Sequence, residues 1–271
     1  MIKQAIIPLA GMGTRLLPLT SVIPKELLPI NGKPGLEYIL DECINAGIEE
    51  IIFIISKNKH QIKKYFYNDM FYKKLIKKKR SDKRLKYEYM KIKKFKSMIK
   101  FVYQNSPRGT GDAVLKCKNL IKSKYFLMLM PDDLILNYNC SSAIINIHNK
   151  YKSSVIASKK VMRNNVSRWG IFDIKRINKK NFIINDVVEK PAVKDAPSNY
   201  AVIGRYILPK KIFNVLKRQK PGKNKEIHIT DAIRSLILKK DKFYGHIFAG
   251  KYLDCGSMKG YIESSLKISK L

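Results

Sequence analysis

Short apolar runs alternate with helical patterns along the first half of the chain. The apolar runs are four to six residues long and rich in β-branched residues, which is typical of buried strands. Between them, apolar residues recur at helical spacing. The predicted strands are Gln4–Leu9, Glu50–Ile55, Ile99–Tyr103 and Tyr125–Met130. The predicted helices are Gly35–Ala46, Lys59–Phe66 and Ala113–Ile121. This order predicts an α/β fold, a Rossmann-like, mostly parallel twisted sheet flanked by helices.

The second half of the chain has a different pattern. Three longer segments with strand character come close together, and we expect them to form a small mixed sheet that extends the substrate site. They are Ser154–Met162, Phe182–Val188 and Tyr200–Leu208. Predicted helices at 210–218, 230–240 and 258–268 and a strand at 243–248 complete the chain. We expect a single domain over 1–271, with a nucleotide-binding half at 1–135 and a sugar-phosphate-binding half at 136–271.

Composition places few further limits on the fold. The chain has 271 residues, of which 45% are hydrophobic, enough for one sizeable core. No apolar run approaches the roughly 18 residues of a membrane-spanning helix, and no cleavable leader precedes the first strand, so we expect a cytoplasmic protein without a membrane partner. The four cysteines form no C-x-x-C pair, so free thiols are expected rather than zinc ligands.

The net charge of +34 raises the question of a polyanionic partner. The excess comes from 45 lysines against 10 arginines, in a chain also rich in isoleucine, asparagine and tyrosine. All of these residues have A/T-rich codons, so genomic base composition explains much of the charge. The segment 57–100 stands apart, with 18 Lys or Arg residues against three acidic ones. It is either a solvated helical insertion, which we favour, or a polyanion-binding surface.

Candidate chemistry begins directly after the first strand. Residues 9–29 read LAGMGTRLLPLTSVIPKELLP, with Gly11 and Gly13 followed by Arg15 and Lys25. Glycines allow a tight turn and close approach of a ligand, and successive main-chain N–H groups in such a turn form an anion site. Arginine and lysine add positive charge for phosphate oxygens. The segment therefore predicts a phosphate site, although it matches neither G-x-G-x-x-G nor the P-loop, and an ordinary strand-to-helix turn explains its spacing equally well.

Four other stretches carry polar groups at predicted strand ends. Asp132 and Asp133 follow a buried strand, where they either bind a hard cation such as Mg²⁺ or form a turn. Glu189 and Lys190 end a later strand, where a surface ion pair is the alternative interpretation. The other two stretches are a second glycine-rich loop, QNSPRGTGD at 104–112, and the carboxylate-glycine segment YLDCG at 252–256.

Taken together and in this order, the motifs resemble the bacterial UTP–glucose-1-phosphate uridylyltransferases, within the wider sugar-nucleotidyltransferase family. The likeness spans essentially the whole chain. It rests on LAGMGTRLLPLTSVIPKELLPINGKP, PDD, VVEKP, PSNYAVIGRY, EIHITDAI and YLDCGSMKGY. The PKELLP segment is similar to uridylyl enzymes, since thymidylyl enzymes usually carry KQLLP. A glycosyltransferase-A-like nucleotidyltransferase fold is therefore implied, with UTP and glucose 1-phosphate as partners, Mg²⁺ as cofactor, and a homo-oligomer.

The resemblance also implies roles for individual residues. Arg15, Lys25 and Lys190 are the implied catalytic cations. The implied nucleotide-binding residues are Ala10, Gly11, Gly13, Glu26, Gln104 and Gly109. Gly170, Glu189 and Lys190 are implied to bind the sugar phosphate. Asp132 and Asp254 are the implied Mg²⁺ ligands, with Asp132 favoured over Asp133 because the second position varies in the family.

The chain departs from the family pattern in three places. Asp112 stands where the family often has histidine, Trp169 stands where Tyr or Phe is usual, and 57–100 is unusually basic. Two alternatives stay open: a thymidylyl or broader-specificity enzyme, and, more remotely, a basic nucleic-acid-binding protein on an enzyme-derived fold. Nucleic acid is not the expected partner, because the candidate site residues are all present.

Overall fold

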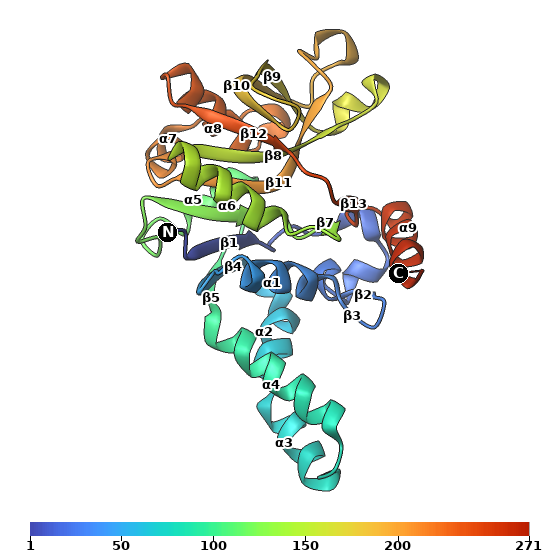
Figure 1. Cartoon of the computed structure of the whole chain (residues 1–271). Helices are drawn as coiled ribbons and strands as arrows, with labels where there is room; N and C mark the ends of the chain where they lie inside the picture. The colour runs from blue at the N-terminus through green and yellow to red at the C-terminus, as the bar shows by residue number, and fades with distance from the viewer. Residues whose placement is uncertain (271) are drawn as a thin grey trace.

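A nine-stranded sheet runs through the protein, whose residues 1–270 are described by a computed structural model (Figure 1). The strand order is β5-β4-β1-β6-β11-β8-β12-β10-β9. The strands are β1 Gln4–Pro8, β4 Glu50–Ile55, β5 Ile99–Tyr103, β6 Tyr125–Leu129, β8 Ser154–Lys160, β9 Gly170–Arg176, β10 Asn181–Glu189, β11 Tyr200–Pro209 and β12 Phe243–Ile247. Two small antiparallel pairs lie outside it: β2 Pro29–Ile30 with β3 Lys33–Pro34, and β7 Asp133–Leu136 with β13 Lys251–Asp254.

The helices lie on both faces of the sheet. They are α1 Gly35–Asn45, α2 His60–Tyr67, α3 Asp69–Lys78, α4 Lys83–Met98, α5 Thr110–Leu115, α6 Cys140–Tyr151, α7 Ile212–Arg218, α8 Ile229–Leu238 and α9 Met258–Ser269. One core contains side chains of α1, α2, α4 and α6, and the other contains side chains of α5, α7 and α8. Along β1, Ile6 belongs to one core and Ile7 to the other, because successive side chains of a strand point to opposite faces. Burial on both faces explains why β1 is a continuous apolar run.

The expected fold class is confirmed, and one feature differs from the expectation. Strands β5, β4, β1 and β6 are parallel, as predicted. The strands of the second half do not form a sheet of their own. Antiparallel pairing of β11 with β6 joins them to the same sheet, and β9 reaches back to β11 at the Ala201–Ile171 pair. The sugar-side residues are therefore carried by the same sheet as the first glycine loop.

Most predicted elements lie within two residues of their expected positions, and the largest shift is in α5. This helix starts at Thr110 and ends at Leu115, whereas 113–121 was expected. Gly109, with φ of 102°, directly precedes it, and turns replace the helix after Leu115. The sequence pattern also missed α6, β7, β9 and β13.

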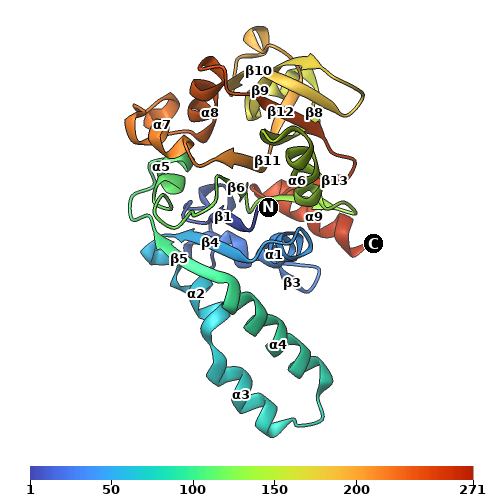
Figure 2. The same cartoon turned by 60° about the vertical axis from the view of Figure 1, so that its left-hand side comes forward.

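The basic segment is helical, as expected. In both views α3 and α4 form a hairpin that projects away from the sheet beyond β5 (Figures 1 and 2). Tyr72 and Tyr89 stack between its two helices, with ring centroids 5.5 Å apart. The base of α4 packs into the core through Ile92 and Phe95. The far end of the hairpin therefore lies away from the strand ends where the candidate residues gather.

Candidate active site

Two adjoining pockets contain every residue proposed from the sequence for substrate or metal binding. The first has a volume of about 390 Å³, and its walls include Ala10, Gly11, Gly13, Arg15, Lys25, Glu26, Gln104, Gly109 and Asp132. The second has a volume of about 470 Å³, and its walls include Gly170, Glu189, Lys190 and Asp254. Arg15 and Asp132 line both pockets, so they lie where the two meet.

The first glycine loop leaves the carboxyl end of β1 and forms one wall of the first pocket. Gly13 has φ of 70°, a left-handed conformation that favours glycine, and its carbonyl accepts a hydrogen bond from Thr20 Oγ1 at 2.8 Å. A Cβ added to Gly11 would meet no atom within 4 Å, so packing does not explain this glycine. The open space beside it leaves room for a ligand to approach the main chain closely.

The second glycine loop is held against the C-terminal half of the chain. Gly111 N–H donates to the Ile227 carbonyl at 2.7 Å, and Ile227 N–H donates to the Arg108 carbonyl at 2.8 Å. A Cβ on Gly109 would lie 2.6 Å from the Ile227 oxygen, so no other residue fits there without displacing the main chain. The loop that carries Gln104 is therefore placed by a segment more than one hundred residues later in the sequence.

Lys25 and Asp132 form an ion pair at the junction of the pockets, with Nζ 2.8 Å from Oδ2. Burial alone would lower the pKa of Lys25, but the carboxylates of Asp132 and Glu26 together outweigh it, and the pKa is raised. Burial would raise the pKa of Asp132, but Lys25 beside it lowers this pKa overall. Both groups are therefore held in their charged forms at neutral pH.

Asp254, the last residue of β13, also lies at the junction of the two pockets. A Cβ added to Gly256 would lie 2.8 Å from Asp132 Oδ2, 3.1 Å from Asp254 Oδ1 and 3.3 Å from Arg15 Nη2. The three groups therefore converge beside a glycine whose missing side chain leaves the space open. Asp254 is oriented by Arg168, whose Nη2 donates to Oδ2 at 2.8 Å, and by the Gly256 N–H.

This donor set fits a magnesium ion that also binds substrate. Among residues 1–270, no group of three or more His, Cys, Asp or Glu side chains could hold a metal ion. Mg²⁺ does not require such a group, because it usually takes one or two carboxylates and completes its shell with phosphate oxygens and water. Two converging carboxylates at the junction with the pocket that the first glycine loop lines match that requirement.

Asp133 has a different environment from Asp132. Its Oδ1 accepts from Tyr252 Oη at 2.6 Å and its Oδ2 from Gly204 N–H at 2.9 Å. Burial and the neighbouring Asp132 raise the pKa of Asp133 to about 6. Its two carboxylate oxygens therefore connect β7 to β13 and to β11.

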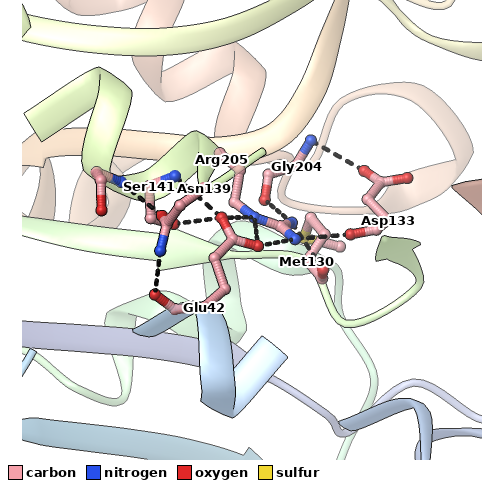
Figure 3. Close-up of polar contacts among 8 residues, drawn as sticks. Glu42, Met130, Asp133, Asn139, Ser141, Gly204 and Arg205 are labelled. Atoms are coloured by element: carbon pink, nitrogen blue, oxygen red, sulfur yellow. Dashed lines mark hydrogen bonds and ion pairs between the residues drawn. The ribbon is translucent and has the colours of Figure 1, made fainter. Parts of the chain in front are cut away.

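A buried ion pair of Arg205 and Glu42 holds the main chain around Asp132 in place (Figure 3). Arg205, with no exposed surface, donates from Nε and Nη2 to the carboxylate of Glu42 on α1 at 2.7–3.0 Å. Its other hydrogens reach the carbonyls of Met130, Gly204 and Asp133. Because Met130 and Asp133 flank Asp132, this guanidinium fixes the main chain on both sides of the carboxylate.

Glu26 has a partner that sequence reasoning missed. Lys59 Nζ lies 2.8 Å from both Glu26 oxygens and 2.6 Å from the Leu9 carbonyl, and both side chains are buried. Burial lowers the pKa of Lys59 despite the attraction of Glu26. In the sequence, Lys59 is one of many lysines in a basic segment, and no local signal separates it from the others. The pair fastens the first glycine loop to the start of α2.

The second pocket brings Gly170, Glu189 and Lys190 together. Glu189 Oε2 accepts from Thr230 Oγ1 at 2.7 Å, and a Cβ on Gly170 would lie 3.3 Å from the same oxygen. Lys190 has φ of 46°, an uncommon conformation for a residue with a side chain, and its Nζ lies 3.7 Å from Glu189 Oε1. Arg168 and Thr230 also line this pocket and were not anticipated.

Comparison with known proteins gives a consistent result. Residues 4–270 match the model of the nucleotidyl transferase family. The UTP–glucose-1-phosphate uridylyltransferase 2 of Streptococcus pyogenes is 36% identical, covering 98% of this chain and 89% of that protein.

Two solved structures agree with this match over nearly all of their length. A UDP-glucose pyrophosphorylase complexed with UDP-glucose has a TM-score of 0.89 and 37% identity, covering 100% of this chain and 99% of that one. A UTP-bound enzyme of the same kind from Acinetobacter baumannii has a TM-score of 0.89 and 33% identity. The match covers 99% of this chain and 93% of that one.

Proposed function

The chain belongs to the nucleotidyl transferase family, and from this premise we propose that it is a UTP–glucose-1-phosphate uridylyltransferase. The reaction joins glucose 1-phosphate and UTP to give UDP-glucose and pyrophosphate. A phosphate oxygen of glucose 1-phosphate forms a bond to the α-phosphorus of UTP. The bond from that phosphorus to the oxygen of pyrophosphate breaks, and pyrophosphate leaves with the electron pair.

The observation that carries the proposal is the pair of pockets that share Arg15 and Asp132. A nucleotide in the first pocket and a sugar phosphate in the second would bring their phosphates together at that shared wall. The attacking oxygen is already ionised, so no general base is needed. The protein has to bring two anions together, and it supplies cations at the junction.

The free-energy cost of bringing the two anionic substrates together is mainly electrostatic. Two unit charges about 6 Å apart repel by roughly 3 kcal/mol at an effective dielectric constant near 20. Arg15 and Lys25 would offset the charge of the triphosphate, and Lys190 that of the sugar phosphate. Catalysis then rests on positioning and electrostatic stabilisation, as in other phosphoryl transfers.

In the nucleotide pocket, the main chain of Ala10, Gly11 and Gly13 would follow the nucleotide. Gln104 and Gly109 would bind the uracil. Glu26, which also lines this pocket, would bind the uracil with them. Lys59 contacts both of its carboxylate oxygens and holds them in place, and each oxygen keeps a further lone pair for the ligand.

Asp132 and Asp254 would hold Mg²⁺, which when bound neutralises phosphate charge. Arg168 keeps Asp254 turned toward Asp132, and Arg205 holds the main chain around Asp132. In the second pocket, Glu189, oriented by Thr230, would accept hydrogen bonds from sugar hydroxyls. Gly170 leaves room for the sugar ring beside it.

Three broader properties belong to the same proposal. Residues 1–135 and 136–271 act as the nucleotide and sugar-phosphate halves of one domain. The protein works as a homo-oligomer, a dimer or tetramer, in the cytoplasm, where nucleoside triphosphates are made. Within residues 1–270 no helix has the length and apolar character needed to span a membrane.

The test is pyrophosphate release by the purified protein with Mg²⁺, glucose 1-phosphate and each of UTP, dTTP, CTP, ATP and GTP. We expect turnover with UTP to exceed that with every other nucleotide, with UDP-glucose as the product by mass spectrometry. Faster turnover with dTTP would favour a thymidylyl enzyme. Salt-sensitive nucleic-acid binding without pyrophosphorolysis of UDP-glucose would instead favour the binding-protein alternative.

A further inference from the structure

Gln104 stands at the carboxyl end of β5 in the wall of the nucleotide pocket and is 4% exposed. Its Nε2 donates to Asp112 Oδ2 at 2.7 Å and to the Gly109 carbonyl at 3.3 Å. A carboxylate and a carbonyl only accept hydrogen bonds here, so the nitrogen end of the amide has to face them. Among residues 1–270, with the side chain of residue 223 left aside, no protein group donates to Oε1 of Gln104, which leaves this oxygen for a ligand.

Asp112 is itself held in place. It is 2% exposed, and Arg108 Nη2 lies 2.9 Å from its Oδ1. One carboxylate oxygen therefore accepts from Arg108 and the other from Gln104. Arg108 is largely exposed and does not line the pocket, so its contribution reaches the pocket only through Asp112.

We propose that Asp112 is a positioning residue that selects the base, by keeping the Gln104 amide turned so that its oxygen faces the nucleotide. The proposal rests on the uridylyl transfer function and on uracil lying beside Gln104. Uracil has an N3–H donor at its pairing edge, which suits an acceptor. Cytosine has a lone pair at N3, which an acceptor oxygen repels. Thymine has the same N3–H as uracil and is not discriminated by this contact.

The Asp112→Asn substitution tests the proposal with almost no change of shape. The introduced amide has one oxygen for two donors, and the charged Arg108 forms the stronger hydrogen bond to it. The nitrogen of the new amide then faces Gln104, which turns its own oxygen toward that nitrogen and its own nitrogen toward the base. We expect the ratio of kcat/KM for UTP to that for CTP to fall at least tenfold. The UTP to dTTP ratio and the KM for glucose 1-phosphate should stay within twofold.

Removing Arg108 provides the matched rescue. Lys116 Nζ lies 4.0 Å from the same carboxylate oxygen, so it is replaced as well. In Arg108→Met/Lys116→Met/Asp112→Asn, neither cation competes for the oxygen of the new amide, so Gln104 can donate to it again and at least part of the UTP preference should return. Arg108→Met alone should keep the wild-type ratio. If Asp112→Asn does not fold, as judged by circular dichroism and melting, Asp112→Ser removes the carboxylate and should lower the same ratio.

The two proposals can fail separately. Turnover of the wild type with UTP reports on the function, and the change in the UTP to CTP ratio reports on Asp112. A ratio that stays within twofold in a folded Asp112 variant overturns the positioning role while leaving the uridylyl transfer function intact. An equal loss with UTP, CTP and dTTP overturns it as well, since that result indicates general damage to the pocket.

Discussion

Lys25 and Lys190 line different pockets of the candidate site. Lys25 pairs with Asp132 at the junction of the pockets, whereas Lys190 lines the second pocket beside Glu189. Their charges should therefore act on different substrates.

Replacing each lysine by alanine should separate the two effects. We expect Lys25→Ala to raise the KM for UTP about tenfold or more, with a smaller change for glucose 1-phosphate, and Lys190→Ala to do the reverse. Each lost charge-assisted hydrogen bond is worth about 1.5–3 kcal/mol. Initial rates with one substrate varied at a time measure both constants. If both variants raise the same constant, the assignment of the two cations is wrong.

Substitution of Asp132 and Asp254 tests whether these carboxylates bind Mg²⁺. Asp132→Asn and Asp254→Asn should each lower turnover by about a hundredfold or more, because a neutral amide binds a hard cation poorly. The concentration of Mg²⁺ needed for half-maximal rate should also rise. Asp133→Asn is the neighbouring control, and it should mainly lower stability, since Asp133 bonds to Tyr252 and Gly204. Near-normal activity in either ligand variant would remove that residue from the metal site.

Among the elements, the hairpin of α3 and α4 contributes most to the unusual charge of the chain. Its cations are spread along both helices, and few of them have acidic partners: Lys96 pairs with Asp69 and Lys91 with Glu37. Lysine, a point charge, predominates there over the bidentate arginine. The hairpin projects away from the sheet, and a Debye length of about 8 Å screens its charges from the pockets.

Neutralising the exposed lysines of the hairpin should leave uridylyl transfer nearly unchanged at physiological salt. The set for Lys→Gln exchange is Lys73, Lys74, Lys77, Lys78, Lys83, Lys86, Lys93 and Lys94. Turnover should stay within about twofold, with a modest loss of substrate on-rate at low salt. Lys91→Gln, which breaks the contact to buried Glu37, is the comparison expected to lower stability. A tenfold fall in turnover with the fold preserved would show that the hairpin contributes to the site.

Strands β10 and β12 are joined by a buried histidine that should make stability depend on pH. His246 is 5% exposed, its Nδ1–H donates to Asn181 Oδ1 at 2.8 Å, and its Nε2 accepts from Tyr138 Oη at 2.9 Å. Burial, with Lys180 nearby, lowers the pKa of His246 from 6.5 to about 4. The unfolded chain therefore binds a proton between these pH values that the folded protein does not.

Stability should consequently fall as pH decreases from about 6.5 to about 4, by up to about 3 kcal/mol from this histidine. The contribution is complete above pH 6.5 and is lost toward pH 4. Urea unfolding of the wild type and of His246→Gln at several pH values measures it, because other titrating groups are common to both proteins. The difference in slope between the two proteins is the relevant quantity, and parallel curves would contradict the prediction.

Across the whole molecule, the Arg205–Glu42 pair connects the two halves of the chain. Glu42 lies on α1 and Arg205 on β11, and Ser141 at the start of α6 also donates to Glu42. Burial by itself lowers the pKa of Arg205, but the Glu42 carboxylate raises it overall. The guanidinium therefore remains charged and satisfied at the centre of the fold.

Arg205→Met should destabilise the protein by about 3–5 kcal/mol, because it leaves Glu42 buried without its counter-charge. The double variant Arg205→Met/Glu42→Gln should lose clearly less than the sum of the two single variants. Urea unfolding of the wild type, the two single variants and the double variant gives the coupling energy. A loss below about 1 kcal/mol in the single arginine variant would mean that the pair contributes little to joining the halves.

Local sequence patterns were sufficient for every strand of the nine-stranded sheet except β9, and for several helices. Strands β1, β4 and β6 are nearly continuous apolar runs because helices cover both faces of the sheet, and burial on both faces leaves a signal in each strand. Shorter or more polar elements leave a weaker signal in the sequence. Strand β13 has four residues, KYLD, and α6 begins with CSSA, so neither has a clear period and both were missed.

For the site, sequence motifs identified which residues gather, and the fold determined how they are used. The residues that the family resemblance implied line the two pockets, where they lie close together. The partners of those residues could not be predicted. Lys59 with Glu26, and Asp112 with Gln104, depend on where whole elements pack against one another. Contacts of this kind leave no local period or propensity in the sequence, so they became visible only after the chain was folded.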